Sequence, residues 1–405
     1  MTRSFSASAA VVLWLTVVSS IHAQRTITRA QAIQIALDGS TRVAALASDT
    51  VAANAQLGAA RAYPNPTMTV GYSKSVPQDH LTVEIPLDIP TVRHTRIRAA
   101  AATQTSAHYA FLADRAAIEL DVDTLYTRAE MALSRLDASN ATALDANQLW
   151  QLTEARFAAG DASDLEVQLA RVNAEQLASV AAGDTADATD AALALQAAMG
   201  ISADTLIYQP PHSIEVSFTA MRSDRLPLIA PRVAAAAATL AAAQQTLALQ
   251  RASVFGTPAV QIGVEARDPT GAEHGLLPTI GVALPIPLFN RNGGQISAAR
   301  AAVDRSRAEL ATAHVEAISQ LDRAYRARAS AVTRSVRDGR AAISADSVLI
   351  LSRKAYEEGE MTIADVLQAQ RTYREVLAQN QKDLATVLVN DAIIRIYTGQ
   401  PVTQP

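Results

Sequence analysis

The sequence predicts a mainly α-helical protein with a small β part. In this fold class, long antiparallel coiled-coil helices form an α-barrel, and four strands per chain contribute to a transmembrane β-barrel shared between chains. Three observations lead to it: an alanine-rich composition, an internal repeat and two pairs of alternating strands. Aromatic residues make up 4% of the 405 residues, whereas hydrophobic residues make up 49%. Few large side chains disfavour several thick cores, but small ones let long helices pack closely.

An internal repeat organises the chain, and its two copies are 199 residues apart. At this spacing Pro86 aligns with Pro285, at the end of a strand, and Gly160 aligns with Gly359, after a long helix. One spacing shared by two distant landmarks indicates a duplication. We therefore expect a first structural repeat over residues 24–205, a linker over 206–226 and a second structural repeat over 227–405.

The N-terminus predicts a cleaved signal peptide over residues 1–23. Arg3 supplies the positive charge, an apolar run follows, and the small residues before Gln24 suit cleavage. A retained anchor is the alternative, although the apolar run is short for a membrane span. Beyond Gln24 no apolar run is long enough for a spanning helix, so insertion into a membrane would have to use strands.

Each repeat reads as helix, strand, strand, very long helix, turn and helix. The stretch from 91 to 159 contains neither Gly nor Pro and has helical apolar spacing. We expect each long helix to run beside a stacked pair of shorter ones. The expected helices are 28–62, 91–159 and 161–199 in the first repeat, and 230–254, 295–358 and 361–398 in the second.

The strand pairs alternate between apolar and polar residues. The expected strands are 67–73, 81–87, 260–267 and 279–286. This pattern is typical of a transmembrane barrel, and a soluble sheet with one buried face is the alternative. Four strands cannot close a barrel, whereas three chains together would supply about twelve. The need to close the barrel does not by itself exclude other numbers of chains.

Two motifs resemble the TolC-like outer-membrane efflux proteins. They are "PIPLFNRNGGQISAARAAV" at 285–303 and "YEEGEMTIADVLQAQRTY" at 356–373. The first is similar to the heavy-metal branch, of cobalt-zinc-cadmium and copper-silver type. The resemblance implies a homotrimer in outer-membrane lipid, with a helical tunnel through the periplasm. It also implies docking to a periplasmic adaptor and to an inner-membrane pump of resistance-nodulation-division type, with heavy-metal cations as the expected cargo.

The first motif predicts a turn between the second strand of the second repeat and the long helix that follows it. Its residues are Pro287, Asn290, Arg291, Asn292 and Gly293. Polar side chains and glycine suit a turn at the periplasmic boundary of a membrane. The matching stretch of the first repeat, "DIPTVRH", departs from the motif, and the chain lacks the N-terminal cysteine that many members of the metal branch carry.

The glycines that follow the two long helices predict the turns of helical hairpins. Glycine accepts the left-handed conformation that ends a helix, and Ser163 or Thr362 would cap the helix that follows. By resemblance, these turns form the tips where the adaptor docks. The tip residues are Gly160, Asp161, Gly359 and Glu360.

The resemblance also implies a gate near the second turn. Asp365 and Gln368 share one helix face, at positions where the family has two carboxylates that narrow the entrance. Glu166 and Tyr356 match positions that link neighbouring hairpins, and Met361 stands where the family has an arginine. The alternative for each residue is an ordinary solvated helix face.

Composition and motifs favour neither an enzyme nor a nucleic-acid-binding protein. The formal net charge is −4, and the sequence has no cluster of basic residues with aromatic residues between them. There is no cysteine, no nucleophile elbow and no phosphate-binding loop. His80 and His274 each lie beside an acidic residue, but isolated pairs offer too few ligands for a metal site. We expect no cofactor.

Three alternatives for function stay open. A multidrug outlet and a type I secretion outlet share the expected architecture, because cargo is chosen mostly by the pump. From a different class, a soluble periplasmic coiled-coil adaptor would also carry long hairpins. An adaptor normally has one hairpin on small β domains, whereas this chain has two and little other β sequence.

Overall fold

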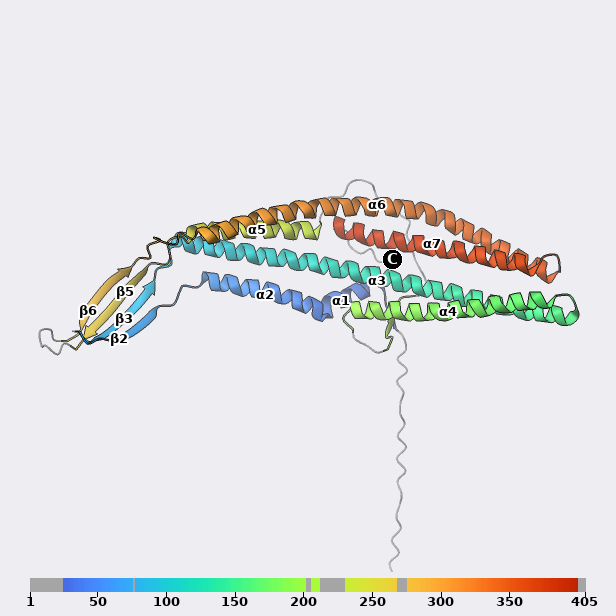
Figure 1. Cartoon of the computed structure of the whole chain (residues 1–405), viewed down its shortest axis with the longest axis horizontal. Helices are drawn as coiled ribbons and strands as arrows, with labels where there is room; N and C mark the ends of the chain where they lie inside the picture. The colour runs from blue at the N-terminus through green and yellow to red at the C-terminus, as the bar shows by residue number, and fades with distance from the viewer. Residues whose placement is uncertain (1–24, 76, 202–204, 212–229, 268–274, 400–405) are drawn as a thin grey trace, which may run out of the picture.

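The computed structural model describes residues 25–75, 77–201, 205–211, 230–267 and 275–399. The expected signal peptide, residues 212–226 of the expected linker and His274 lie outside these residues. The described chain is elongated, with its helices along the long axis and a small sheet at one end (Figure 1). The fold is therefore mainly helical with a small β part, as the sequence predicts.

The order of elements repeats in the two halves of the chain. The first half contains α1 (Arg29–Gly39), α2 (Thr41–Arg61), β2 (Thr67–Tyr72), β3 (Asp79–Pro86), α3 (Pro90–Ala159) and α4 (Asp164–Ala198). The second half contains α5 (Pro231–Ala252), β5 (Ala259–Ala266), β6 (Leu277–Ala283), α6 (Gly293–Glu357) and α7 (Ile363–Thr398). The helices α3 and α6 have 70 and 65 residues, which gives each a length on the order of 100 Å.

The expected single helix over 28–62 is wrong, because the chain breaks at Ser40 into α1 and α2. Ser40 is extended (φ −79°, ψ 138°), and its hydroxyl accepts a hydrogen bond from the Val43 amide at 3.3 Å. This is the geometry of an N-cap, which serine favours. The end of α4 packs against the break: a Cβ on Gly200 would lie 2.9 Å from the Ser40 Cβ.

Two short strands were not predicted. β1 (Arg25–Thr26) pairs in parallel with β4 (Tyr208–Gln209), which belongs to the segment that the sequence assigned to the linker. Strands of two residues have no periodicity that a sequence pattern can reveal. Their pairing attaches the segment before α1 to the segment after α4.

The larger sheet has the strand order β2-β3-β5-β6, and all its neighbours are antiparallel. Its register places apolar residues opposite one another on one face: Met68, Val83, Ile262 and Ile280 form one row across all four strands. Thr69, Thr82, Gly263 and Thr279 form a row on the other face. The last strand ends at Ala283 rather than 286, since Pro285 cannot donate to the ladder.

The apolar face of this sheet is uncovered in the described chain. Ile280 is 82% exposed, Val70 is 74% exposed and Met68 is 66% exposed. The sheet lies beyond the ends of the helices, so none of the described helices packs on it (Figure 1). A soluble sheet would bury this face, so the structure argues against that alternative.

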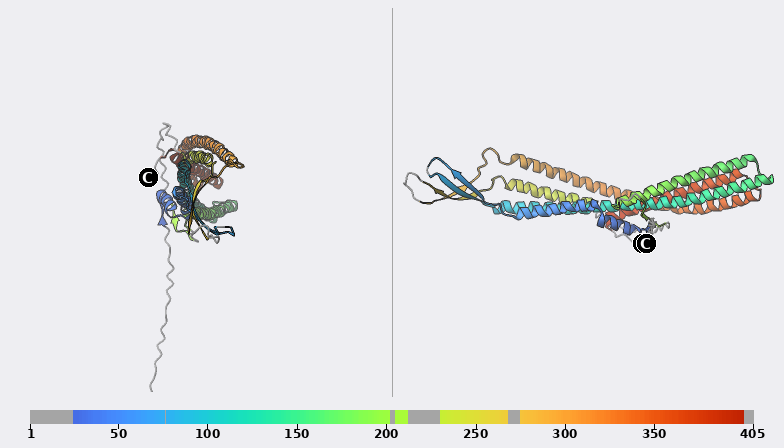
Figure 2. Two further views of the ribbon diagram at one scale, coloured as in Figure 1. Left: turned by 90° about the vertical axis from the view of Figure 1, so that its left-hand side faces the viewer. Right: turned by 90° about the horizontal axis from the view of Figure 1, so that it is seen from below.

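The helices form the expected arrangement of long helices beside stacked shorter ones. α3 packs against α1, α2 and α4, and α6 packs against α5 and α7. The hairpins α3–α4 and α6–α7 end together at the extremity opposite the sheet (Figures 1 and 2). Among the described helices, none combines the length and the apolar character that crossing a membrane requires.

Candidate functional site

The tips of the two hairpins have the turns that the sequence predicts. Gly160 (φ 88°) and Gly359 (φ 79°) are left-handed. The amide of Asp161 donates to the Arg156 carbonyl at 2.8 Å, and the amide of Glu360 donates to the Ala355 carbonyl at 2.8 Å. These bonds satisfy carbonyls that a helix end leaves without partners. All four predicted tip residues are exposed.

Two of the predicted gate residues lie in the first turn of the helices that follow these turns. The Glu166 carboxylate accepts from the Ser163 amide at 2.7 Å, and the Asp365 carboxylate accepts from the Thr362 amide at 3.2 Å. Each serine or threonine hydroxyl in turn accepts from the amide of its acidic partner, which completes a capping box. Both carboxylates therefore have a structural role as the N3 partners of capping boxes, in which Ser163 and Thr362 are the N-caps.

Asp365 and Gln368 also share one exposed face of α7, as the sequence predicts. Asp365 lies in the first turn of this helix, where a carboxylate is favoured by the helix dipole. Gln368 makes no side-chain hydrogen bond to another described residue. Both side chains remain available to solvent or to a neighbouring chain.

Tyr356 lies at the junction of the two hairpins and is 1% exposed. Its hydroxyl donates to the Thr153 hydroxyl on α3 at 3.1 Å. The Arg156 guanidinium lies 4.6 Å from the centre of the Tyr356 ring, and it donates to the Tyr356 carbonyl and, at 3.3 Å, to the Asp161 carbonyl. Within one chain, Tyr356 therefore joins the second hairpin to the first, whereas the side-chain bonds of Glu166 stay within its own capping box.

Sequence reasoning missed Arg156. By resemblance, Met361 on the second hairpin stands where the family has an arginine, whereas Arg156 comes from α3 on the first hairpin. Met361 is 40% exposed. The only sequence signal was the position of Arg156, one helical turn before the glycine that ends α3, where a basic residue suits a helix C-terminus.

A buried charge cluster near the middle of α3 was also missed. Arg29 pairs with Asp123 and, at 2.9 Å, with Glu130, while Arg395 at the end of α7 pairs with the second oxygen of Asp123. Asp123 is fully buried. Burial raises the pKa of Glu130 above its ordinary value, despite the opposing effect of Arg29. The same burial raises the pKa of neighbouring Tyr126 to about 12.

The turn between the sheet and α6 is anchored by one of the predicted junction residues. Asn292 is left-handed (φ 59°), and its side-chain amide donates to the Gln250 carbonyl at 2.8 Å. Its own backbone amide donates to the Asn290 side chain at 2.9 Å. Asparagine tolerates this conformation better than most residues. Gly293 then begins α6, while Arg291 is exposed and Pro287 is half-buried.

The first repeat anchors its turn differently. The side chain of Asp88 is 4% exposed and forms ion pairs with Arg96 at 2.7 Å and with Arg93 at 3.3 Å. At the repeat spacing, Arg93 occupies the position of Asn292. A charged anchor therefore replaces the amide anchor, which explains why the motif is lost while the turn remains.

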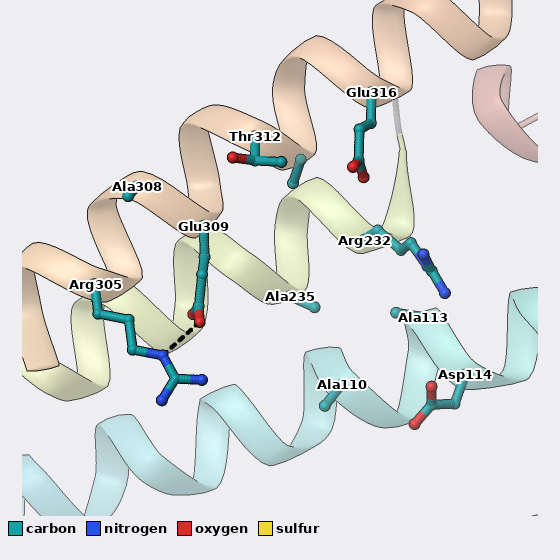
Figure 3. Close-up of a pocket in the computed structure, with 11 residues that line it drawn as sticks. Ala110, Ala113, Asp114, Arg232, Ala235, Arg305, Ala308, Glu309, Thr312 and Glu316 are labelled. Atoms are coloured by element: carbon teal, nitrogen blue, oxygen red, sulfur yellow. Dashed lines mark hydrogen bonds and ion pairs between the residues drawn. The ribbon is translucent and has the colours of Figure 1, made fainter.

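A groove of about 530 Å³ lies between α3, α5 and α6, and small side chains form much of its wall (Figure 3). Arg305 and Glu309 pair across one helical turn at 2.7 Å along its edge (Figure 3). Within the described parts of the chain, no group of three or more potential metal ligands occurs. His80 pairs with Glu265 at 3.3 Å on the polar face of the sheet.

The described chain is an elongated helical protein with two joined hairpins at one end and a sheet with an uncovered apolar face at the other. The model of the outer membrane efflux protein family matches residues 32–201 and 228–399, and the chain belongs to this family. It is therefore an outer-membrane efflux protein, as the resemblance implied. Membership excludes the soluble adaptor alternative.

Individual relatives agree with this family. The chain is 25% identical over 379 residues to the cobalt-zinc-cadmium resistance protein CzcC of Cupriavidus metallidurans, covering 88% of each chain. The fold is similar to VceC of Vibrio cholerae (TM-score 0.75, 18% identity, 92% of this chain and 96% of that one). It is also similar to the CmeC outer membrane channel of Campylobacter jejuni (TM-score 0.77, 14% identity, 92% and 86%).

Proposed function

We propose that this protein is the outer-membrane exit duct of a tripartite efflux system that removes heavy-metal cations. The observation that carries the choice of cargo is the similarity to a cobalt-zinc-cadmium resistance protein along 88% of both chains. In this proposal, a periplasmic adaptor contacts the hairpin tips, and an inner-membrane pump of resistance-nodulation-division type supplies the energy.

The duct is a homotrimer in this proposal, and three sheets close one barrel in outer-membrane lipid. The uncovered apolar face supports contact with lipid, because water would penalise so much apolar surface. The strands β2 and β6 each have one edge without a partner in the described chain, and a barrel removes such edges. The polar face then lines the pore.

Exposed apolar stripes on the helices also support association of several copies. Leu165, Leu169 and Val172 form one on α4, and Val336, Ile343 and Ile350 form another on α6. In this proposal, the α4 stripe of one copy contacts the α6 stripe of the next. Contact between two different surfaces of identical copies produces a ring when the rotation from copy to copy adds up to a full circle. The exposed Asp365 and Gln368 then narrow the entrance of that ring.

A deletion strain tests the cargo. We expect cells without this protein to become sensitive to zinc, cobalt or cadmium in growth assays, and the cloned gene to restore resistance. Copper and a set of common antibiotics serve as the comparison. Sensitivity to antibiotics alone would replace the metal proposal with the multidrug alternative, and loss of a secreted protein would favour type I secretion.

A further inference from the structure

Positive charge gathers at the level where the strands pass into the helices. The end of α2, the start of α3, the end of α5 and the start of α6 all face the sheet (Figure 1). The segments around these four helix ends, 58–66, 87–101, 248–258 and 284–303, contain seven arginines and one acidic residue, Asp88. The whole chain has a formal net charge of −4, so the charge at this level is opposite in sign to that of the chain.

Two of the seven arginines are used within the chain. Arg93 and Arg96 pair with Asp88, and Arg96 also donates to the Ala60 carbonyl at 3.0 Å, which attaches the end of α2 to α3. The other five are exposed, and none of them pairs with an acidic residue in the parts of the chain that the structure describes. These junction arginines are Arg61, Arg98, Arg251, Arg291 and Arg300.

The next arginines along α6 are paired with carboxylates. Arg305 pairs with Glu309 at 2.7 Å, and Arg307 pairs with Asp304 at 3.0 Å, each across about one helical turn. The sequence therefore supplies a carboxylate beside each of these arginines and supplies none beside the junction arginines. The charge at the junction is left for a partner outside the chain.

The internal repeat does not explain the junction arginines. At the spacing of 199 residues, Arg98 aligns with Ser297, Arg300 aligns with Ala101, and none of the five aligns with another arginine. Both repeats nevertheless place arginines at the same level of the molecule. What the two repeats share is the distance of these residues from the sheet, rather than their positions in the repeat.

Large apolar side chains are exposed at the same level. Four of them are at least 65% exposed: Tyr63, Phe255, Leu288 and Phe289. Leu288 and Phe289 follow β6 in the chain, so the apolar surface of the sheet continues into the junction. Aromatic and basic side chains occur together where lipid tails meet charged headgroups.

The junction arginines lie close enough to the sheet to reach such a boundary. Arg61 and Arg251 lie in the last turns of α2 and α5. Arg98 and Arg300 lie within about 12 Å of the starts of α3 and α6, at a rise of about 1.5 Å per residue. Side chains on a helix tilt toward its N-terminus, which here is the end nearest the sheet. A long arginine side chain can therefore carry its guanidinium back to the boundary.

We infer that this junction binds anionic phospholipid headgroups, of the phosphatidylglycerol type, in the periplasmic leaflet of the outer membrane. This inference rests on the proposed function, in which the sheet stands in lipid and the helices extend into the periplasm. Guanidinium groups offer paired donors that match phosphate oxygens, and the lipid tails cover the exposed aromatic and apolar side chains. The junction then holds the duct at a fixed depth in the membrane.

Spin-labelled lipids test the inference on the purified full-length protein in phosphatidylcholine vesicles. Electron paramagnetic resonance distinguishes lipids held at the protein from free ones, and so compares phosphatidylglycerol with phosphatidylcholine. Phosphatidylcholine has a phosphate too, but its own ammonium group offsets the charge. We expect about fivefold stronger association of phosphatidylglycerol, the effect of roughly one basic side chain per headgroup. This preference should disappear in concentrated salt. Equal association of both lipids would overturn the inference.

Two sets of substitutions locate the preference. Glutamine at all five junction arginines should bring it close to one, whereas lysine at the same positions keeps the charge and should keep most of the preference. The matched control removes the same charge from five exposed arginines that pair with carboxylates elsewhere: Arg42, Arg128, Arg171, Arg326 and Arg337. This control should retain the wild-type preference. Equal loss in both glutamine sets would mean that net charge attracts the lipid, and the junction would have no special role.

The remaining outcomes separate this inference from the proposed function. If the wild-type protein holds both lipids equally, the sheet contacts lipid and the inference alone is wrong. If it holds neither lipid, the placement of the sheet in the membrane has failed, and the proposed duct fails with it. If sodium phosphate removes the preference and sodium chloride of equal ionic strength does not, the arginines bind free phosphate, and the lipid inference is wrong.

Discussion

Arg156 shows how one side chain joins two hairpins that are far apart in sequence. It offers several donors in one plane, so it bonds the Tyr356 and Asp161 carbonyls while its face lies on the Tyr356 ring. Lysine has neither the planar shape nor the paired donors. The contribution of Arg156 is therefore one of position as well as charge.

We expect Arg156→Ala to loosen the tips of both hairpins. The loss of a charged hydrogen bond and a cation–π contact should lower local stability by about 2 kcal/mol. Amide hydrogen exchange measures this, through faster exchange in the last turns of α3 and α6 together. The matched control is Arg171→Ala, because Arg171 lies over Trp150 within one hairpin. Equal loosening in both variants would contradict a specific role for Arg156.

Asp365 has two roles, and a single substitution that removes both cannot tell which of them matters. As a capping residue it stabilises the start of α7, and as an exposed carboxylate it is the proposed source of the charged ring. Alanine removes both roles, although Thr362 stays in place as the N-cap. Asparagine removes the charge and keeps a hydrogen-bond acceptor for the Thr362 amide.

We therefore expect both Asp365→Ala and Asp365→Asn to raise conductance or weaken block by multivalent cations in planar lipid bilayers. A ring of like charges attracts cations and repels itself, so its removal changes both properties. If only the alanine variant differs from wild type, the cap rather than the charge is responsible. Unchanged conductance and block in both variants would remove Asp365 from the gate.

At the scale of elements, the long helices and the larger sheet could be predicted from the sequence because each has a long periodic pattern. The break at Ser40 could not, since an extended N-cap leaves the apolar spacing on both sides unchanged. The pairing of β1 with β4 joins residues too few and too distant for any pattern. The tip glycines were predictable from backbone chemistry, whereas the partner of Tyr356 depended on packing between hairpins.

The two faces of β6 allow a sharp test of the lipid-facing surface. We expect Ile280→Arg to reduce assembled protein in the outer membrane, because arginine near the middle of a bilayer costs about 2–4 kcal/mol on this type of surface. The neighbouring variant Thr279→Arg changes the polar face of the same strand and should assemble. Heat-resistant oligomers on a denaturing gel report assembly. Equal losses in both variants would argue against a lipid-facing role for Ile280.

At the scale of the whole molecule, the buried charge cluster joins parts that the repeat alone does not connect. Arg29 comes from the start of α1, Asp123 from the middle of α3 and Arg395 from the end of α7. Each oxygen of Asp123 faces a different arginine, so removal of this carboxylate would leave two poorly solvated cations. A sequence shows such residues only as single charges in helical segments, which is why the cluster escaped prediction.

The Glu130 carboxyl of this cluster should make stability depend on pH. Arg29 donates to it, the charges of Asp123 and Tyr126 act on it, and burial is the main cause of its raised pKa. A carboxyl with a raised pKa in the folded state binds its proton more tightly when folded. Its stabilising effect is therefore complete below its ordinary pKa of 4.5 and is lost as the pH rises through the raised value.

Comparison with Glu130→Gln isolates this effect, because glutamine does not titrate. We expect the difference in Tm between wild type and Glu130→Gln to fall as the pH rises from 4.5 through the raised pKa, and then to level off. Glu154→Gln, at an exposed position of the same helix, should not reproduce this course. A difference that grows with pH would mean that the ionised pair of Glu130 with Arg29 outweighs the cost of burying its charge. The cluster would then hold α1 on α3 by attraction between ionised groups, rather than most strongly when Glu130 is protonated.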